Sequence, residues 1–304
     1  MSSMQSQSDS TQVVVVVGAT GRTGLELCSE LAKKPGVIVR AAVHTPAKAT
    51  GLPESAQRVR FDINDASSVT AAFTGAHKLF LLTPRGGLGP IYTRMLADAA
   101  RRAGIRSLVK LSSFEPEIQP QSPADLWALD SEKALREAEI PHTVLRPNWF
   151  FQNFHTGYFQ PLLAQRVLPL PFGQGLAGWI DCRDIAAVAA KVLLEPGHLG
   201  LTYELTGPAA ISLEEIASVL SRASGQEIRY LPLSERDWLE RARAAGYPDH
   251  EAWGILAHIA KTRDGHAARL TDDVERLLGR KPISFEQYAQ DYAPQLRALT
   301  ARAA

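Results

Sequence analysis

The stretch VVVVVGATGRTG, residues 13–24, decides the fold: five valines run directly into a loop that contains three glycines. A run of β-branched residues is typical of a strand that is buried on both faces of a sheet. Leu25, Cys28 and Leu31 follow the loop at helical spacing. The stretch therefore predicts a buried strand, a tight glycine loop and an amphipathic helix, in that order.

The three glycines of this loop suit the binding of a dinucleotide. Gly18 permits the tight turn, Gly21 lets the backbone approach a diphosphate, and Gly24 lets the helix lie close to the strand. The unpaired amides and the positive end of the helix dipole would then meet the phosphates. Glycines also follow strands where nothing binds, but the strand, loop and helix together favour a nucleotide site. We expect the whole loop to hold the cofactor: Gly18, Ala19, Thr20, Gly21, Arg22, Thr23 and Gly24.

The end of the second predicted strand, residues 37–43, bears on the choice between NAD(H) and NADP(H). An acidic residue at that place binds the ribose 2′-hydroxyl and repels a 2′-phosphate. Here His44 follows the strand with no acid beside it, Lys48 lies just beyond, and Arg22 projects from the glycine loop. These cations favour NADP(H) over NAD(H), although surface lysines and arginines are often merely solvated.

The first half of the chain alternates predicted strands with helical segments. Helices between successive strands imply parallel β-α-β crossovers, so we expect an α/β fold with a doubly wound parallel Rossmann sheet. The strands are expected at residues 13–17, 37–43, 58–61, 78–82, 107–111 and 142–146.

This alternation stops after Pro147, where a segment rich in aromatic residues and prolines begins. A strand at residues 201–205 looks suited to return to the main sheet. We expect a smaller C-terminal substrate lobe that is interleaved with the Rossmann domain. The expected parts are a disordered tail over 1–12, the NAD(P)-binding domain over 13–150 with returning segments near 179–206, and the substrate lobe over 151–178 and 207–304.

The composition excludes several classes of protein. The formal net charge is +1 and no basic stripe is present, which argues against a nucleic-acid partner. No apolar run approaches the ~20 residues of a membrane span, and the first residues do not form a secretory signal. Cys28 and Cys182 lie too far apart for a metal knuckle, so we expect no metal and a cytoplasmic location. The expected partner is a small-molecule substrate, and both a monomer and a homodimer stay open.

Six motifs of the chain can be compared with those of known families: GATGRTG at 18–24, FDIND at 61–65, LVKLSS at 108–113, SEK at 131–133, TVLRPNWFFQNF at 143–154 and WIDCRDIA at 179–186. Over about residues 13–228, they resemble the NmrA-like group of atypical short-chain dehydrogenases. The group includes quinone, azo-dye and triphenylmethane-dye reductases and ergot-type iminium reductases, and the resemblance implies an activity of this kind.

The resemblance also implies roles for particular residues. Asp62 and Ile63 would meet the adenine, and Lys133 would reach the nicotinamide ribose. All the implied positions except Lys133 fall at the carboxyl ends of predicted strands, where open α/β sheets bind ligands. The others would line the ribose, the nicotinamide and the substrate: Leu82, Thr83, Pro84, Ser112, Ser113, Phe114, Pro147, Asn148, Trp149 and Phe150.

The chain departs from catalytic short-chain dehydrogenases at one informative position. They generally carry a tyrosine four residues before the lysine, and here Leu129 stands four before Lys133. Carbonyl reduction needs a proton donor at the developing alkoxide, so this reaction is disfavoured. An extended electron-poor acceptor, such as a quinone, azo compound, dye cation or iminium ion, needs less help.

The aromatic segment after Pro147 has two interpretations. Trp149, Phe150 and Phe154 could form a stacking wall for a flat substrate, or they could be ordinary packing between lobes. His155 and Tyr158 lie in the same segment, and with Lys133 they are the candidate catalytic residues.

The sequence therefore predicts an NADPH-dependent reductase that transfers hydride to a conjugated acceptor. The alternative is a non-catalytic NADP(H)-binding redox sensor of the NmrA type, which the missing tyrosine also suits. A carbonyl reductase with a displaced acid would need Tyr158 or His155 beside the nicotinamide.

Overall fold

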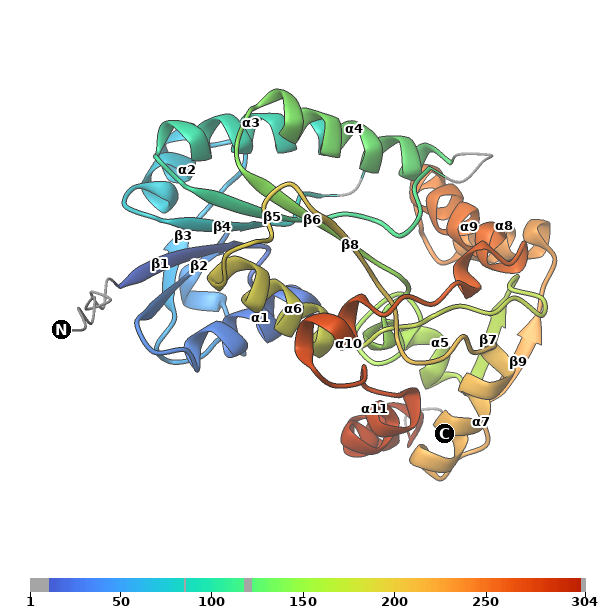
Figure 1. The fold of residues 1–304 in the computed structure, drawn as a ribbon. Helices are drawn as coiled ribbons and strands as arrows, with labels where there is room; N and C mark the ends of the chain where they lie inside the picture. Colours follow the sequence, from blue (N-terminus) through green and yellow to red (C-terminus); the bar gives the residue numbers. More distant parts are fainter. Residues whose placement is uncertain (1–10, 85, 118–121, 302–304) are drawn as a thin grey trace.

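The computed structural model describes residues 11–84, 86–117 and 122–301 (Figure 1). Residues 1–10 of the expected tail lie outside the described residues. The tail was expected to reach residue 12, but Gln12 already pairs with Val37 as the first residue of strand β1 (Gln12–Val17).

A sheet of seven parallel strands forms the centre of the molecule, in the order β3-β2-β1-β4-β5-β6-β8. The chain winds outward from β1 in one direction and then from β4 in the other, which confirms the doubly wound parallel fold. The remaining strands are β2 (Val37–Val43), β3 (Gln57–Arg60), β4 (Lys78–Leu81), β5 (Ser107–Leu111), β6 (His142–Pro147) and β8 (Thr202–Leu205).

Four of the five valines, Val14 to Val17, are buried because helices cover both faces of the sheet (Figure 1). Val14 and Val16 pack in one core with α1 (Arg22–Ala32) and α6 (Cys182–Leu194). Val15 and Val17 pack on the opposite face in a second core. That face is covered by α2 (Ala66–Phe73), α3 (Gly89–Arg102) and α4 (Pro123–Glu137).

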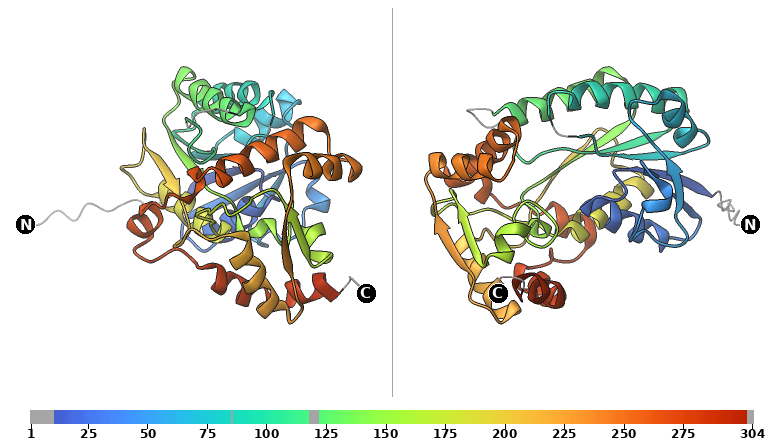
Figure 2. Two further views of the ribbon diagram at one scale, coloured as in Figure 1. Left: turned by 90° about the vertical axis from the view of Figure 1, so that its right-hand side faces the viewer. Right: turned by 180° about the vertical axis from the view of Figure 1, so that it is seen from behind.

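A second group of elements lies beyond the carboxyl edge of β5, β6 and β8 and has its own aromatic core (Figure 2). It contains a two-stranded parallel sheet of β7 (Val167–Leu170) and β9 (Arg229–Pro232). Its helices are η2 (Phe151–Asn153), α5 (Gln160–Ala164), α7 (Leu213–Ser224), α8 (Glu235–Ala244), α9 (Asp249–Arg263), η3 (His266–Ala268), α11 (Phe285–Asp291) and α12 (Ala293–Thr300).

The chain passes between the two groups several times. Strand β8 joins the main sheet beside β6, in register Val144 to Thr202. Much later in the chain, α10 (Asp273–Leu278) returns to the main sheet, where Val274 and Leu277 join the core beneath α6. Over the described residues, no helix is long and apolar enough to cross a membrane.

Candidate cofactor and substrate site

The glycine loop between β1 and α1 has the geometry of a phosphate cradle. Gly18 has a φ of +79°, and a Cβ at this position would lie 3.1 Å from the side chain of Leu82. A Cβ on Gly24 would lie 2.1 Å from the carbonyl oxygen of Gly18, so only glycine lets α1 begin so close to the loop. Gly21 caps α1 without a side chain, and the first turn carries no acid. The first amides of α1 are therefore suited to a diphosphate.

The adenine end of the expected site lies at the ends of β2 and β3. Nε2 of His44 is 3.7 Å from Oδ2 of Asp62, and His44 is largely exposed. Oδ1 of Asp62 accepts a hydrogen bond of 3.0 Å from the amide of Asn64. Ile63 is half-buried and Lys48 is exposed. The structure thus brings His44 and Asp62 together beside the strand that precedes the glycine loop.

Arg22 does not join these cations at the end of β2. Its guanidinium carbon lies 5.9 Å from the ring centre of Phe150 and 5.7 Å from that of Tyr158. Phe150 follows β6, and β6 lies on the opposite side of β1 from β2 in the strand order. Arg22 therefore reaches toward the aromatic segment, and the expected cluster of three cations is not formed.

Loops after β4 and β5 form the next part of this edge. Leu82 is half-buried against the position of Gly18, and Pro84 is exposed. Thr83 is buried, with Oγ1 3.4 Å from Oγ1 of Thr93. The residues after β5 are half-buried at the same edge: Ser112, Ser113 and Phe114.

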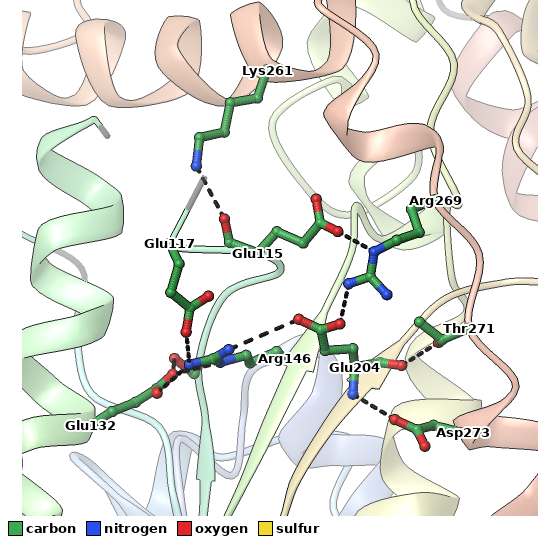
Figure 3. A network of polar contacts seen from close by, with 10 residues as sticks. Glu115, Glu117, Glu132, Arg146, Glu204, Lys261, Arg269, Thr271 and Asp273 are labelled. Atoms are coloured by element: carbon green, nitrogen blue, oxygen red, sulfur yellow. Dashed lines mark hydrogen bonds and ion pairs between the residues drawn. The ribbon is translucent and has the colours of Figure 1, made fainter. Parts of the chain in front are cut away.

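A network of ion pairs joins the ends of β5, β6 and β8 (Figure 3). Arg146 donates to both oxygens of Glu132, from Nε at 3.0 Å and from an Nη at 2.6 Å. The same guanidinium lies 2.7 Å from Glu117 and 3.9 Å from Glu204. Burial lowers the pKa of Arg146, but the hydrogen bonds to Glu132 and Glu117 and the negative charges of both carboxylates together outweigh burial and raise the pKa.

Helix α9 and the segment after it extend the network across the edge of the sheet (Figure 3). The Lys261 ammonium lies 2.9 Å from the fully buried carboxylate of Asp125 and donates to the carbonyl of Glu115 at 3.2 Å. Arg269 bridges the carboxylates of Glu115 and Glu204. These residues were not predicted from the sequence, although Glu132 and Arg146 lie inside the motifs SEK at 131–133 and TVLRPNWFFQNF at 143–154.

Lys133 was expected at the nicotinamide ribose, and the structure places it elsewhere. Its side chain is 66% exposed on the outer face of α4, where it lies 3.8 Å from Glu137. With Ile91 and Met95 of α3, it lines a hollow between the two helices on that outer face. The adjacent residue Glu132 faces inward instead, because neighbouring residues of a helix point about 100° apart. Lys133 is therefore not part of the carboxyl edge.

His155 was a candidate acid and lies in the aromatic interior. Its Nδ1 is 2.6 Å from the hydroxyl of Tyr288, and its ring stacks on Tyr292 at 4.3 Å. Burial lowers the pKa of His155 to about 4, so the imidazole is neutral near pH 7. A neutral imidazole packed against α11 is not placed as a proton donor for the cofactor edge.

The aromatic segment divides between core and site. Phe154 is fully buried, at 0% exposed, among Phe159, Trp179 and Phe285, so it belongs to the core and not to a substrate wall. Trp149 is half-buried, and its indole donates to Thr262 at 2.9 Å.

Phe150 is half-buried against Arg22, and Tyr158 lies on the same guanidinium, so the structure brings these two rings to the start of α1. Pro147 is buried. Asn148 is buried too, and its amide donates to the carbonyl of Ala267 at 2.9 Å. One of its side-chain N–H groups is thus used within the protein, on the 3-10 helix η3 that follows α9.

The described residues contain no group of three His, Cys, Asp or Glu side chains that could hold a metal ion. The site is built instead from backbone amides, half-buried aromatic rings and paired charges, all at the carboxyl edge of one sheet. These features define a class of protein: a Rossmann-type protein with a dinucleotide site at the carboxyl edge of its sheet, next to a second group of elements.

The sequence model of the NmrA-like family matches residues 10–288, and the chain belongs to this family. It is 30% identical to an NAD(P)H azoreductase of Xenophilus azovorans over 287 residues, which covers 92% of this chain and 98% of that protein. Its named relatives of similar identity are oxidoreductases, and this chain is an oxidoreductase with a nicotinamide cofactor.

Solved structures agree with this assignment. An NADPH-dependent quinone oxidoreductase of Escherichia coli, complexed with NADPH, is similar with a TM-score of 0.80 at 27% identity, over 92% of this chain and 99% of that one. A Citrobacter sp. triphenylmethane reductase complexed with NADP(H) gives 0.78 at 26% identity, over 93% and 99%. The transcriptional regulator NmrA with NAD gives 0.71 at 20% identity, over 93% and 96%, a likeness that concerns the fold alone.

Proposed function

We propose that the protein is an NADPH-dependent reductase that passes hydride to a conjugated small molecule, such as a quinone, an azo compound, a dye cation or an imine. The observation that carries the proposal is the meeting of the glycine cradle with half-buried aromatic rings at one edge of the sheet. Arg22, the first residue of α1, lies against both Phe150 and Tyr158. A bound nicotinamide supplies the hydride, and the chain supplies orientation and a cavity shielded from water.

The type of acceptor that we propose follows from where the candidate proton donors lie. Leu129 occupies the place of the usual phenol, Lys133 points outward and His155 is held neutral in the interior. Reduction of a ketone requires a positioned acid, whereas reduction of an iminium carbon requires none. The ring of Tyr158 lies against Arg22, so Tyr158→Phe would test whether any acceptor depends on the proton of this phenol.

The preference for NADPH is supported by the end of β2. His44 and Lys48 are exposed there, and no acid follows Val43 directly. Lys48→Glu should raise the dissociation constant of NADPH about fivefold relative to that of NADH, because an exposed charge pair contributes up to about 1 kcal/mol. Lys34→Glu, at the far end of α1, should leave the ratio of the two constants unchanged. Calorimetric titration of each variant with NADPH and with NADH measures this ratio.

The activity is tested by following NADPH oxidation by the purified protein, with quinones, azo compounds, dye cations and cyclic imines offered in turn. Turnover of at least one class is expected. Failure with every class, while NADPH still binds, would contradict the reductase and favour a redox sensor. The likeness to the regulator NmrA does not itself favour a sensor, because it concerns the fold alone. A small-molecule acceptor as partner and a cytoplasmic location go with the proposal.

A further inference from the structure

Ser112 is the first residue after β5, and both of its hydrogen-bond donors, the backbone amide and the hydroxyl, bind acceptors within the protein. Its backbone amide donates to the carbonyl of Leu145 at 2.8 Å, which continues the ladder between β5 and β6. Its hydroxyl donates to Oε1 of Glu132 at 2.6 Å. What Ser112 can still offer at the edge of the sheet is the lone pairs of its hydroxyl oxygen, because a hydroxyl has one proton and two acceptor sites.

The direction of the Ser112 hydrogen bond is fixed by the partners of Glu132. This glutamate is 2% exposed, and both of its oxygens accept from the guanidinium of Arg146. An arginine fork donates only, so it stabilises the ionised carboxylate, which has no proton to return to Ser112. If the Ser112 hydroxyl pointed away from Glu132, the buried Oε1 of Glu132 would lose one hydrogen-bond donor, and this loss costs free energy.

The peptide before Ser112 is held from the same face of the sheet. The buried ammonium of Lys110 donates to the carbonyl of Leu111 at 2.6 Å. Burial lowers the pKa of Lys110 to about 8, and the nearby charge of Glu132 opposes this shift. The carbonyl of Leu111 and the hydroxyl of Ser112 are thus both held, the first by a buried lysine and the second by a buried glutamate.

The ligand group that fits an oriented acceptor is a hydrogen-bond donor. The proposed acceptors, which are quinones, azo compounds, dye cations and iminium ions, do not need a hydrogen bond from the Ser112 hydroxyl at their reacting atoms. The carboxamide of nicotinamide carries two N–H donors in both its oxidised and its reduced form. Ser112 is half-buried at the edge where the nicotinamide half of the cofactor is expected, two strands from β1.

We propose that the Ser112 oxygen accepts a hydrogen bond from the carboxamide N–H of nicotinamide, and that Glu132 is the positioning residue that turns the Ser112 proton away from the cofactor. The inference rests on the nicotinamide site of the proposed function. It assigns a cofactor-recognition role to a buried glutamate that touches no ligand.

The test compares two reduced cofactors by calorimetry without any acceptor present. One is NADPH, and the other is its 3-acetylpyridine analogue, which keeps the carbonyl but lacks the N–H donors. The native protein should bind NADPH the more tightly. Ser112→Ala should shrink the ratio of the two dissociation constants about fivefold, the size expected for one hydrogen bond. A purely structural role for Ser112 would change both constants together and leave the ratio intact.

Two further variants make the test specific. Glu132→Gln lets an amide donate to Ser112 and so frees the hydroxyl proton, and the ratio should shrink again. Glu117→Gln is the matched control, because Glu117 contacts the same guanidinium at 2.7 Å but is 57% exposed and is not the carboxylate that Ser112 contacts. The ratio should not change in this control.

The outcome remains decisive if Glu132→Gln does not fold, because Ser112→Ala leaves the pair of Glu132 and Arg146 in place. An unchanged ratio in folded Ser112→Ala overturns the inference. Since no acceptor is used, this result is independent of turnover. A protein that binds NADPH with the expected ratios but reduces no acceptor would overturn the proposed reductase alone.

Discussion

Gly24 is the residue at which the cofactor loop tolerates a side chain least. A Cβ at this position would lie 2.1 Å from the carbonyl oxygen of Gly18 and 2.8 Å from Cα of Ala19, both of which are backbone atoms. Gly24→Ala must therefore move α1 away from the loop. We expect a loss of more than about 3 kcal/mol of unfolding free energy, beyond ordinary overpacking, and loss of NADPH binding. Urea denaturation and calorimetric titration measure the two effects.

Gly254 in α9 provides the matched control for that substitution. Among the described residues, a Cβ built there meets no atom within 4 Å apart from its chain neighbours and the backbone of its own helix. Gly254→Ala should therefore stabilise the protein by about 0.5–1 kcal/mol, because alanine loses less backbone entropy than glycine in a helix. If both substitutions had the same effect, the close approach at Gly24 would not be the cause.

His155 should make the stability of the protein sensitive to acid. Burial lowers its pKa from 6.5 to about 4, against the nearby charge of Asp181. Between these values the unfolded chain binds a proton that the folded chain does not, so stability falls as the pH falls from 6.5 to 4. His155→Phe should remove up to about 3 kcal/mol of this loss, as a pKa shift of one unit corresponds to 1.36 kcal/mol.

The measurement is urea denaturation of the native protein and His155→Phe at several pH values. The variant loses the hydrogen bond to Tyr288, but burial raises the pKa of that phenol well above its usual value. The lost hydrogen bond therefore shifts the curve by the same amount at every acidic pH. Parallel pH profiles for the two proteins would show that His155 titrates normally in the folded state.

At the scale of elements, the sequence predicted the main sheet well because most of its strands are short, largely apolar runs bounded by turns. The valines of β1 have buried side chains on both faces, which explains an unbroken run without alternation. A capping box at Ser212 and Glu215 opens α7, a pattern that can be read from the sequence. The small sheet of β7 and β9 was not predicted, because both strands contain a proline, which edge strands tolerate.

Helix α9 was missed although its signal is present. Ala252, Ile255, Leu256 and Ile259 are buried at intervals of three and four residues, directly after Pro248. Nothing in that spacing, however, shows that Lys261 at the other end of the helix meets Asp125. Long-range ion pairs depend on how two helices are placed in space, and the sequence carries no separate pattern for them.

The difference between Glu132 and Lys133 shows the limit of motif matching at the site. The motif places the segment in α4 but does not give its rotation. Helical phase does: Glu132 stands seven residues after Asp125 and three before Leu135, and all three are buried. Lys133 stands four before Glu137, which is exposed. A helix that turns Leu135 toward the core also turns Glu132 inward and Lys133 outward, so the helical phase favours Glu132 as the residue at the site.

The docking of α9 on α4 should depend on the buried pair of Lys261 and Asp125. The lysine side chain is 13% exposed and the aspartate 0%. Lys261→Met would leave the carboxylate with Ser122 as its remaining polar contact in the described structure, so we expect a loss of about 2–3 kcal/mol in unfolding free energy. Arg236→Met, which breaks an exposed pair with Glu240, should cost under about 1 kcal/mol.

Urea denaturation of both variants under the same conditions makes the comparison. Equal losses would mean that the ion pair of α9 contributes no more than a surface pair. A larger loss of unfolding free energy in Lys261→Met would show that this ion pair at the edge of the sheet stabilises the contact between the two groups of elements.

At the scale of the whole molecule, neither group of elements is a continuous piece of chain. The main sheet takes its last strand, β8, and the helix α10 from beyond the aromatic segment. Asp273 of α10 accepts from the amide of Glu204 at 2.8 Å, at the edge of that strand. Asn148 and Lys261 add buried contacts between the groups. Unfolding of the aromatic core would therefore remove part of the support of the main sheet.

We expect the two groups to unfold in one cooperative transition. Native-state hydrogen exchange at increasing urea concentration can follow β1 at Gln12–Val17 and α7 at Leu213–Ser224 separately. Both segments should report the same free energy of unfolding, because the chain crossings and the buried contacts couple them. Exchange of α7 at a clearly lower free energy than β1 would show that the second lobe opens alone. The aromatic core beyond the carboxyl edge would then open while the glycine cradle stayed folded.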